Sequence, residues 1–275
     1  MFNDIEAFWY VVLFVASVFG GLVGSLSGGA GMITMPLLLL SGLNPLQAIA
    51  TNKLQACVGS FTGAAHYYKN GLMDFQQSRI YIVIAIVFSS LGAALVQFVS
   101  LEILSKVLPF VMILVGIYFL FSSKLSDKDR ARTKYPLLLY ASCAVASVYG
   151  GLLGVGIGSF VLVIFVGLAG YGLSKALAYS RSIVFSINLS SALLFIAGGN
   201  VLWILGVLMC VGQMIGASLG AKLALKSGAK VIRPVVICLC FIMSIRLIIK
   251  EFFSVHLTHF LGQVRQRVRP SLYRS

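Results

Sequence analysis

The stretch that decides the fold is AFWYVVLFVASVFGGLVGSLSGGAGMITMPLLLLSGLNPLQAIATN, residues 7–52, in which no Asp, Glu, Lys or Arg occurs. As one straight α-helix it would extend ~70 Å, more than twice the ~30 Å hydrocarbon core of a bilayer. The chain must therefore turn back or break inside this stretch. The glycine cluster at residues 28–31, followed by Pro36, marks where it does so.

Comparable uncharged runs occupy residues 80–101, 135–174 and 182–221. Of the 275 residues, 59% are hydrophobic and only 10% are charged. A water-soluble domain carries about 25% charged residues, so this composition excludes a soluble enzyme. It predicts an all-α fold, a polytopic transmembrane helical bundle surrounded by the lipid bilayer.

The net charge of +14 arises from 21 Lys and Arg against 7 Asp and Glu. The basic residues fall in short connections between apolar runs, which is the positive-inside pattern of membrane proteins and not a nucleic-acid-binding face. We therefore expect no nucleic-acid partner. The five cysteines lie within apolar runs and lack metal-ligand spacing, so no metal site and no cofactor is predicted.

Charged and polar breaks delimit the expected helices. They are placed near residues 8–27, 32–42, 47–68, 80–99, 104–122, 137–153, 157–168, 174–198, 201–222 and 231–250. Two of them, 32–42 and 157–168, are too short to cross a bilayer.

An internal repeat becomes visible when the sequence is shifted by 130 residues. The shift pairs Gly20, Gly21, Gly24 and Gly28 with Gly150, Gly151, Gly154 and Gly158. We therefore expect two homologous halves with glycine-broken or re-entrant helices. The first membrane repeat is 1–123, a charged cytoplasmic linker is 124–134, the second membrane repeat is 135–250, and a basic C-terminal tail is 251–275.

Two topologies fit the distribution of charge. If each glycine segment is a re-entrant hairpin, each half crosses three times more and the halves are inverted repeats, with the basic loops inside and the Arg-rich tail outside. If each glycine segment crosses once, the chain makes eight crossings, both ends are inside, and the basic loop at 222–233 is exported. The inverted form keeps more of the basic loops on the cytoplasmic side, and we favour it.

Ionisable residues deep in a span mark candidate sites, because burying them in lipid is costly. Lys53 and Arg181 are the main examples, with Arg246 and His66 as weaker ones, and no carboxylate lies in a span interior. Such a pathway suits an anion. The helix breaks add to this, since the second piece of a broken helix presents unpaired backbone N–H groups.

The same features fit less specific roles as well. Lys53 and Arg181 would mark interfacial helix ends if their side chains snorkel to lipid head groups. The glycine segments would serve close helix packing alone. An intramembrane serine hydrolase built on Ser25 or Ser27 with His66 is a further alternative, although the Gly-x-Ser-Gly pattern of such enzymes is not matched.

The motifs resemble the TauE/SafE sulfite exporter family, also called the 4-toluene sulfonate uptake permease family. The resemblance lies in the glycines from Gly20 to Gly31 and in the segment Ala48-Ile-Ala-Thr-Asn-Lys-Leu-Gln-Ala-Cys57. Val211–Ala217 and Leu225–Pro234 resemble its YfcA-like branch of probable membrane transporters in particular. The resemblance spans about residues 8–250.

The resemblance implies a multi-pass transporter of the bacterial inner (plasma) membrane, in a family linked to export or uptake of sulfite and organosulfonates. We therefore expect a secondary transporter of small anions that works by alternating access and has no catalytic residue; a passive anion channel is the alternative. Assembly into a homodimer is left open. The expected anion-binding residues are Gly28, Gly29, Gly31, Thr51, Asn52, Lys53, Gln55, Gly154, Gly156, Gly158, Arg181 and Asn188.

Overall fold

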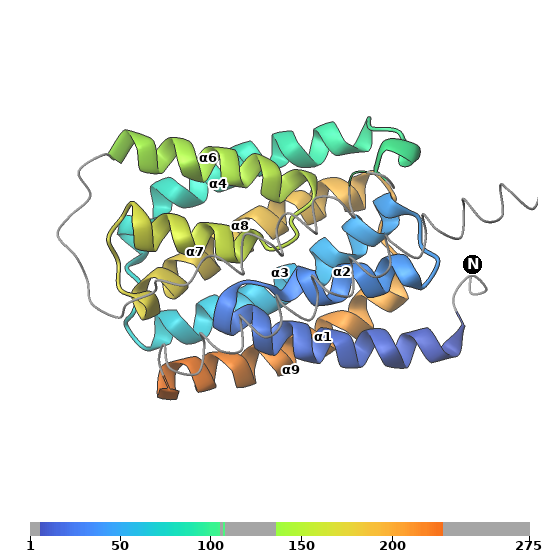
Figure 1. Ribbon diagram of the computed structural model, residues 1–275, viewed down its shortest axis with the longest axis horizontal. Helices are drawn as coiled ribbons and strands as arrows, with labels where there is room; N and C mark the ends of the chain where they lie inside the picture. Colours follow the sequence, from blue (N-terminus) through green and yellow to red (C-terminus); the bar gives the residue numbers. More distant parts are fainter. Residues whose placement is uncertain (1–5, 105–106, 108–135, 228–275) are drawn as a thin grey trace, which may run out of the picture.

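The computed structural model describes residues 6–104, 107 and 136–227. Within these residues the chain forms helices and no strand, which confirms the all-α expectation (Figure 1). The helices are α1 (Ala7–Ser27), α2 (Ala30–Leu40), α3 (Pro45–Lys69), α4 (Phe75–Gln97), α6 (Pro136–Leu152), α7 (Ile157–Gly167), α8 (Leu173–Ala197) and α9 (Trp203–Ser227). The expected linker 124–134, tail 251–275, helix 231–250 and nearly all of helix 104–122 lie outside the described residues.

The observed bounds differ most from the expected ones where a helix continues beyond its apolar run. Helix α4 begins at Phe75 and not near residue 80, because Asp74 caps it by accepting the Gln76 N–H at 2.8 Å. Helix α9 ends at Ser227 and not near residue 222, so its last turns carry Lys226. Charged residues were expected to mark loops, whereas here they lie on helix ends.

Four of the described helices are long and apolar enough to cross a membrane by length and composition, at Ala7–Leu26, Phe75–Gln97, Leu173–Ala197 and Trp203–Lys226. Helix α4 illustrates the apolar outer surface of such a helix. Its large side chains Val83, Val87, Leu91 and Leu95 are all exposed, although exposing so much apolar surface to water would be unfavourable. The molecule is thus built as a multi-pass membrane protein.

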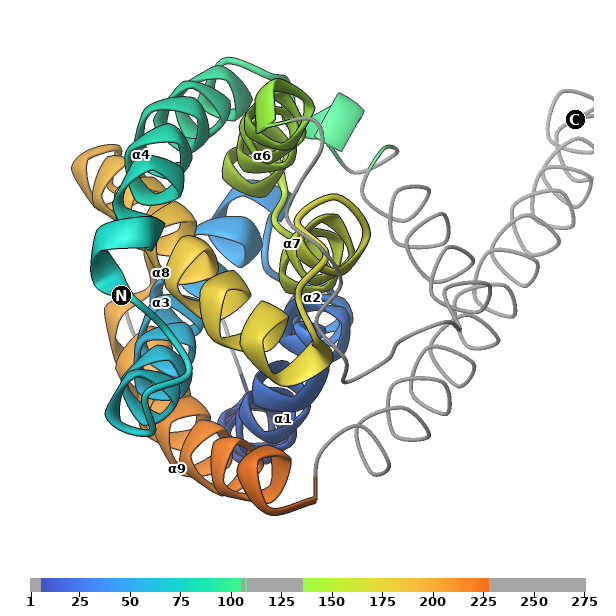
Figure 2. The same ribbon diagram turned by 90° about the vertical axis from the view of Figure 1, so that its left-hand side faces the viewer.

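Helices α3 and α8 occupy the centre of the bundle, with α1 and α9 on one flank and α4 and α6 on the other (Figure 2). The two central helices run antiparallel. The Phe61 and Phe185 rings lie 5.2 Å apart, and Gly63, further along α3, faces Arg181, which is earlier in α8. The polar residues expected to form the site lie mainly on these two helices, which places them inside the protein and away from lipid.

Glycines allow the flanking helices to approach closely. A Cβ atom on Gly216 of α9 would collide with the Val18 carbonyl oxygen of α1, and one on Gly92 of α4 would collide with the Val148 carbonyl oxygen of α6. Small residues at helix contacts are a common solution in membranes, where burial of apolar area does not drive helices together. Part of the glycine content therefore serves helix packing.

Each glycine segment reverses the chain direction. Helix α1 is capped by Gly28, which has a φ of 93°, and α2 then folds back so that Ala30 lies against Gly24 and Thr34 against Gly20. In the second segment Gly154 and Gly156 have φ values of 75° and 71°. These left-handed conformations suit glycine, because a side chain would be strained there.

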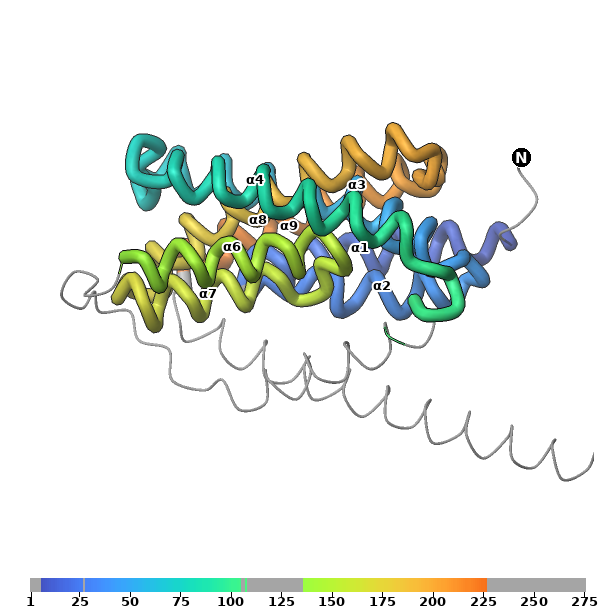
Figure 3. The backbone as a smooth tube through the Cα atoms, turned by 90° about the horizontal axis from the view of Figure 1, so that it is seen from above, coloured from blue at the N-terminus to red at the C-terminus, as the bar shows by residue number. Residues whose placement is uncertain are grey.

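Helix α6 runs opposite to α1 and parallel to α4. Helix α1 starts near the labelled N-terminus and runs along the long axis, whereas α6 enters from the other end (Figure 1). Viewed from above, α4 and α6 lie side by side and run in the same direction (Figure 3). The Tyr81 and Tyr140 rings, early in α4 and α6, lie 5.5 Å apart, which agrees with this view.

Two apolar clusters fill the two ends of the bundle. One contains Leu13, Met35, Ile49, Phe195 and Leu205. The other contains Tyr67, Leu139, Phe165, Leu177 and Ala224. Between them lies a polar middle layer, which is where the candidate site is found.

Candidate functional site

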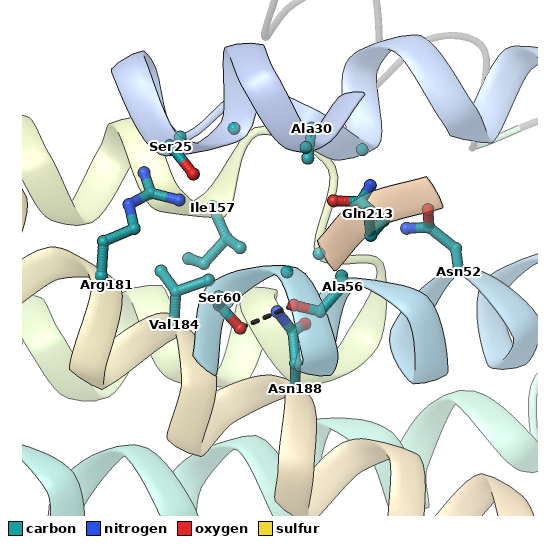
Figure 4. A pocket seen from close by; sticks show the side chains of 16 residues that line it. Ser25, Ala30, Asn52, Ala56, Ser60, Ile157, Arg181, Val184, Asn188 and Gln213 are labelled. Carbon is teal, nitrogen blue, oxygen red and sulfur yellow. Dashed lines mark hydrogen bonds between the residues drawn. The ribbon is translucent and has the colours of Figure 1, made fainter. Parts of the chain in front are cut away.

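A small cavity lies between the two apolar clusters, where both glycine segments meet α3, α8 and α9 (Figure 4). It offers about 30 Å³ to the centres of water-sized molecules, and one such molecule needs about 10–15 Å³ on this measure. It therefore suits a few waters or one small inorganic oxyanion. The lining residues are Gly21, Gly24, Ser25, Gly28, Ala30, Gly31, Asn52, Ala56, Gly59, Ser60, Gly154, Ile157, Arg181, Val184, Asn188 and Gln213.

Arg181 is the charged residue of this lining. Its side chain is only 3% exposed, and the guanidinium extends from α8 toward Ser25 and Ile157 (Figure 4). Two of its nitrogen atoms, Nε and Nη2, are buried and have no hydrogen-bond partner among the described residues. A buried donor without a partner is costly. Arg181 thus presents both charge and unused hydrogen-bond donors to whatever occupies the cavity.

Gln213 provides a further unused donor. It reaches the cavity from α9, and its Nε2 atom is buried without a partner in the part of the chain that the structure describes. The neighbouring glycines make room for this amide, since a Cβ atom on Gly59 would lie 2.5 Å from Gln213 Oε1 and one on Gly20 would lie 3.1 Å from Nε2. At least one function of these glycines is therefore to accommodate a polar side chain.

Asn52 is oriented by two neighbours. Its Oδ1 atom accepts hydrogen bonds from Thr34 Oγ1 at 2.7 Å and from Gln55 Nε2 at 2.8 Å. With the carbonyl oxygen engaged on both sides, the amide nitrogen is the end left to face Gly31 at the cavity wall. Thr34 and Gln55 therefore contribute to the cavity indirectly, by holding the Asn52 amide in its orientation.

The two glycine segments touch each other at the cavity. A Cβ atom on Gly28 would collide with the backbone of Gly158 and Ser159, and Gly31 lies against Val155. Ser180 of α8 donates to the Gly158 carbonyl oxygen at 2.8 Å and so fixes the second segment. The meeting point of the segments is also the wall of the cavity.

The structure brings half of the sequence-predicted residues to the cavity wall. They are Gly28, Gly31, Asn52, Gly154, Arg181 and Asn188. The remaining six, Gly29, Thr51, Lys53, Gln55, Gly156 and Gly158, are not part of the lining. Gly29 and Gly156 cap the starts of α2 and α7, and Thr51 accepts the Leu202 N–H at 3.3 Å.

Lys53 is buried, at 1% exposed, but its ammonium group is engaged elsewhere. Its Nζ atom donates to the Gly150 carbonyl oxygen near the end of α6 and lies beside Gly154. A cation at the C-terminal end of a helix is favourable. Neither Lys53 nor Arg181 reaches the lipid surface, so neither residue marks an interfacial helix end.

Sequence reasoning missed three polar lining residues as ligands. Gln213, Ser25 and Ser60 line the cavity but are not among the expected anion-binding residues, and Ser25 enters the sequence analysis only as an alternative nucleophile. The sequence feature that could have identified them is a neutral polar residue inside an apolar run. The sequence alone did not show which of these residues share one cavity.

The lining is suited to binding anions and not to hydrolysis. Ser25 Oγ donates to the Ala217 carbonyl oxygen, while His66 Nδ1 pairs with the Thr62 carbonyl oxygen of its own helix. Among the described residues, no Asp, Glu, Cys or His lines the cavity, and no group of three or more such side chains could hold a metal ion. What the cavity offers is a cation and amide donors.

Comparison with known proteins agrees with this chemistry. Residues 13–247 match the family described as Sulfite exporter TauE/SafE. The chain is 38% identical over 253 residues to the Probable membrane transporter protein YfcA of Escherichia coli (strain K12), covering 91% of this chain and 93% of that protein. It is 35% identical over 246 residues to a Probable membrane transporter protein of Haemophilus influenzae, covering 89% and 95%. No solved structure matches.

A more distant relative is the Probable membrane transporter protein YunE of Bacillus subtilis, 24% identical over 271 residues, covering 89% of this chain and 99% of that protein. With the apolar helices, these matches make the chain a multi-pass protein of the bacterial inner membrane, and a transporter rather than an enzyme. The family description names export and gives no support to uptake. The chain belongs to the sulfite exporter TauE/SafE family.

Proposed function

We propose that this chain is a secondary transporter that binds a small sulfur oxyanion in the cavity around Arg181 and moves it by alternating access. The observation that carries the proposal is the buried guanidinium, whose Nε and Nη2 atoms lack a partner within the described ranges. An unpaired cation in the interior of a membrane protein marks a substrate or ion pathway. An anion would satisfy both the charge and the donors.

Two inverted repeats would move against each other during transport, and the helix packing supports such an arrangement. Helix α1 packs along α9 as α6 packs along α4, and α3 crosses α8 between these pairs. The 130-residue shift that pairs Gly28 with Gly158 pairs two residues that touch in space. Contacts that keep their pattern when the halves are exchanged, with opposite chain directions, are expected of an inverted repeat.

Alternating access would require each end of the bundle to open in turn. The apolar cluster with Leu13 and Met35 closes one end, and the cluster with Leu139 and Phe165 closes the other. Each cluster includes the short hairpin helix of one half, α2 or α7. We propose that this conformation is the occluded one, and that movement of one hairpin against α3 and α8 opens each side.

The substrate class follows from the family and from the size of the cavity. The family description names sulfite export. The cavity has room for an oxyanion of a few atoms but not, in this conformation, for an aromatic sulfonate. We therefore propose sulfite export over organosulfonate transport. Independence from cofactors and nucleic acid remains a prediction, and assembly into a homodimer is left open.

The test is sulfite flux into liposomes containing the purified protein. The Arg181→Gln variant should reduce saturable flux at least about tenfold, because a charge-assisted hydrogen bond contributes about 1.5–3 kcal/mol. Lys175→Gln is the matched control, since this lysine also lies on α8 but contacts the Tyr171 ring outside the cavity. Equal flux through Arg181→Gln and the wild-type protein would refute the proposed site.

The same vesicles separate a transporter from a passive channel. A transporter loads labelled sulfite against its gradient when unlabelled sulfite leaves, whereas a channel only equilibrates it. The closed apolar ends favour the transporter. Flux that rises linearly with concentration and shows no such exchange would favour the channel.

A further inference from the structure

Two serines of the cavity present oxygen lone pairs to its interior. Ser25 Oγ donates its proton to the Ala217 carbonyl oxygen at 3.0 Å, and Ser60 Oγ donates to the Ala56 carbonyl oxygen at 2.6 Å (Figure 4). A hydroxyl has one proton and two lone pairs, so a serine whose proton is engaged can only accept further hydrogen bonds. Both serines are buried and line the cavity.

The same lining carries donors that are not used. Arg181 Nε and Nη2 and Gln213 Nε2 have no partner in the described part of the chain, and Asn52 turns its amide nitrogen to the wall. A fully deprotonated oxyanion would satisfy these donors but leave the two serine oxygens facing its negative charge. An oxyanion that carries a hydroxyl group would satisfy both the donors and the serine oxygens, since its bare oxygens accept and its hydroxyl donates.

The charge of the lining favours an anion with a single negative charge. Arg181 contributes one positive charge, and no Asp or Glu of residues 6–104 or 136–227 lines the cavity. At the first glycine segment, the C-terminal end of α1 adjoins the N-terminal end of α2, so their opposite partial charges largely cancel. The Lys53 ammonium is bound to the Gly150 carbonyl oxygen outside the lining. A single negative charge balances one guanidinium, and uncompensated buried charge is costly.

We infer that the transported species is a singly charged oxyanion that keeps its own hydroxyl group, hydrogen sulfite rather than the sulfite dianion, bound between the engaged hydroxyls of Ser25 and Ser60 and the free donors of Arg181 and Gln213. This inference rests on the proposed function. The proton crosses the membrane on the cargo, and transport needs no carboxylate relay.

The protein groups that could titrate near the cargo are few. Arg181 of α8 is the titratable side chain of the lining. Around it, Tyr67 of α3 donates its hydroxyl proton to the Ser25 carbonyl oxygen, Tyr149 of α6 donates to the Val155 carbonyl oxygen, and Lys53 of α3 lies beside Gly154. None of these groups is a carboxylate or an imidazole, and each of the three outer side chains donates to a backbone carbonyl oxygen. The dependence of flux on pH should therefore follow the protonation of the transported anion.

The experiment measures initial sulfite flux into proteoliposomes at constant total sulfite, across the pH range in which sulfite takes up its proton. Protein-free liposomes correct for passive entry. The rate should rise with the hydrogen sulfite fraction, and a pH dye inside the vesicles should report proton entry with the anion. A rate that follows the dianion, or flux without proton entry, overturns the inference. Absence of protein-dependent flux at every pH would instead refute the proposed function.

Chlorate provides a matched probe, because it is a pyramidal singly charged oxyanion without a proton. We expect unlabelled chlorate to inhibit the flux of labelled sulfite much more weakly than unlabelled hydrogen sulfite does. In the Ser25→Ala and Ser60→Ala variants this preference should fall about tenfold, since a hydroxyl left without an acceptor loses its hydrogen bond. Ser191→Ala is the control, because Ser191 is buried outside the lining and bonds the Ile187 carbonyl oxygen at 2.6 Å. Equal inhibition by both anions in the wild-type protein also overturns the inference.

Discussion

The two glycine segments occupy equivalent positions in the two proposed halves, but their surroundings differ. At the first, only Gly28 and Gly29 separate α1 from α2, and Gly28, Ala30 and Gly31 all line the cavity. At the second, the N–H groups of Ile157 and Ser159 return to the carbonyl oxygens of Gly154 and Gly156. The first segment also satisfies part of its own backbone, since the Met32 N–H returns to the Gly29 carbonyl oxygen. It differs in contributing more of the cavity wall than the second, of which Gly154 and Ile157 line the cavity.

Side chains reinforce this difference. Lys53 and Ser180 bond carbonyl oxygens of the second segment and the helix before it, at Gly150 and Gly158. The 130-residue shift places Ile183 at the position of Lys53 and Ala50 at that of Ser180, and neither can donate a side-chain hydrogen bond. The two segments are therefore held by different side chains. We propose that the first segment contacts the cargo and that the second is held in place for it.

The largest effect is expected where the segments touch. Gly28→Ala adds a Cβ atom that would collide with the backbone of Gly158 and Ser159, at a residue with a φ of 93°. Left-handed strain alone costs about 1–3 kcal/mol, and the collision comes in addition. We expect loss of folded protein after solubilisation, measured by size-exclusion chromatography and thermal unfolding.

Gly42→Ala separates the effect of backbone strain from the effect of the steric collision. Gly42 has a φ of 89°, but a Cβ atom there would meet no atom of the described residues within 4 Å. It should therefore show only the strain and remain folded. If both variants unfold alike, the close contact between the segments contributes little.

The helices and the position of the breaks could be predicted from the sequence. The absence of charge over residues 7–52 forces a reversal, and glycine is the residue that permits the φ value found at Gly28. Arg181 was also found as a candidate cation, because it lies inside the expected helix 174–198. These inferences depend on local composition and length, which a single sequence contains.

The separate roles of Lys53 and Arg181 could not be predicted in this way. Both are cations on long helices, and the sequence assigns them the same character. What distinguishes them is the group that each side chain meets, a carbonyl oxygen of α6 for Lys53 and an open cavity for Arg181. These contacts join residues about a hundred positions apart, so they depend on tertiary packing.

Lys53 tests the second segment directly. Lys53→Gln removes the cation at the end of α6 without replacing a residue of the cavity lining, so the maximal rate of transport should fall about tenfold or more, as for a lost charge-assisted hydrogen bond. The sulfite dissociation constant, measured by thermal shift, should change less than about threefold. Lys53→Arg keeps a cationic donor and should recover part of the rate.

Arg181→Gln should show the opposite pattern, with weaker binding as its main effect. A rise of the dissociation constant in Lys53→Gln as large as that in Arg181→Gln would place Lys53 in the binding site after all.

A smaller effect is expected for the support of Asn52 at the first segment. Thr34→Val removes one of the two donors to Asn52 Oδ1, which frees the amide to rotate and should weaken sulfite binding by up to about tenfold, or about 1 kcal/mol. Thr34→Ser retains the hydroxyl and should bind like the wild-type protein. Isothermal titration of the two variants measures the difference, and equal weakening in both would show that the Thr34 hydroxyl is not what supports Asn52.

The smallest effect is expected at Ser180. Its hydroxyl donates to the Gly158 carbonyl oxygen and does not line the cavity, so Ser180→Ala should lower stability by about 1 kcal/mol without changing the sulfite dissociation constant. Ser191→Ala removes a buried hydroxyl that bonds its own helix at Ile187 and provides the comparison. If Ser180 holds the second segment, thermal unfolding should begin at a lower temperature in Ser180→Ala than in Ser191→Ala. The reverse order would mean that the second segment keeps its place through Lys53 and its own turns, because the tie from α8 would then be dispensable.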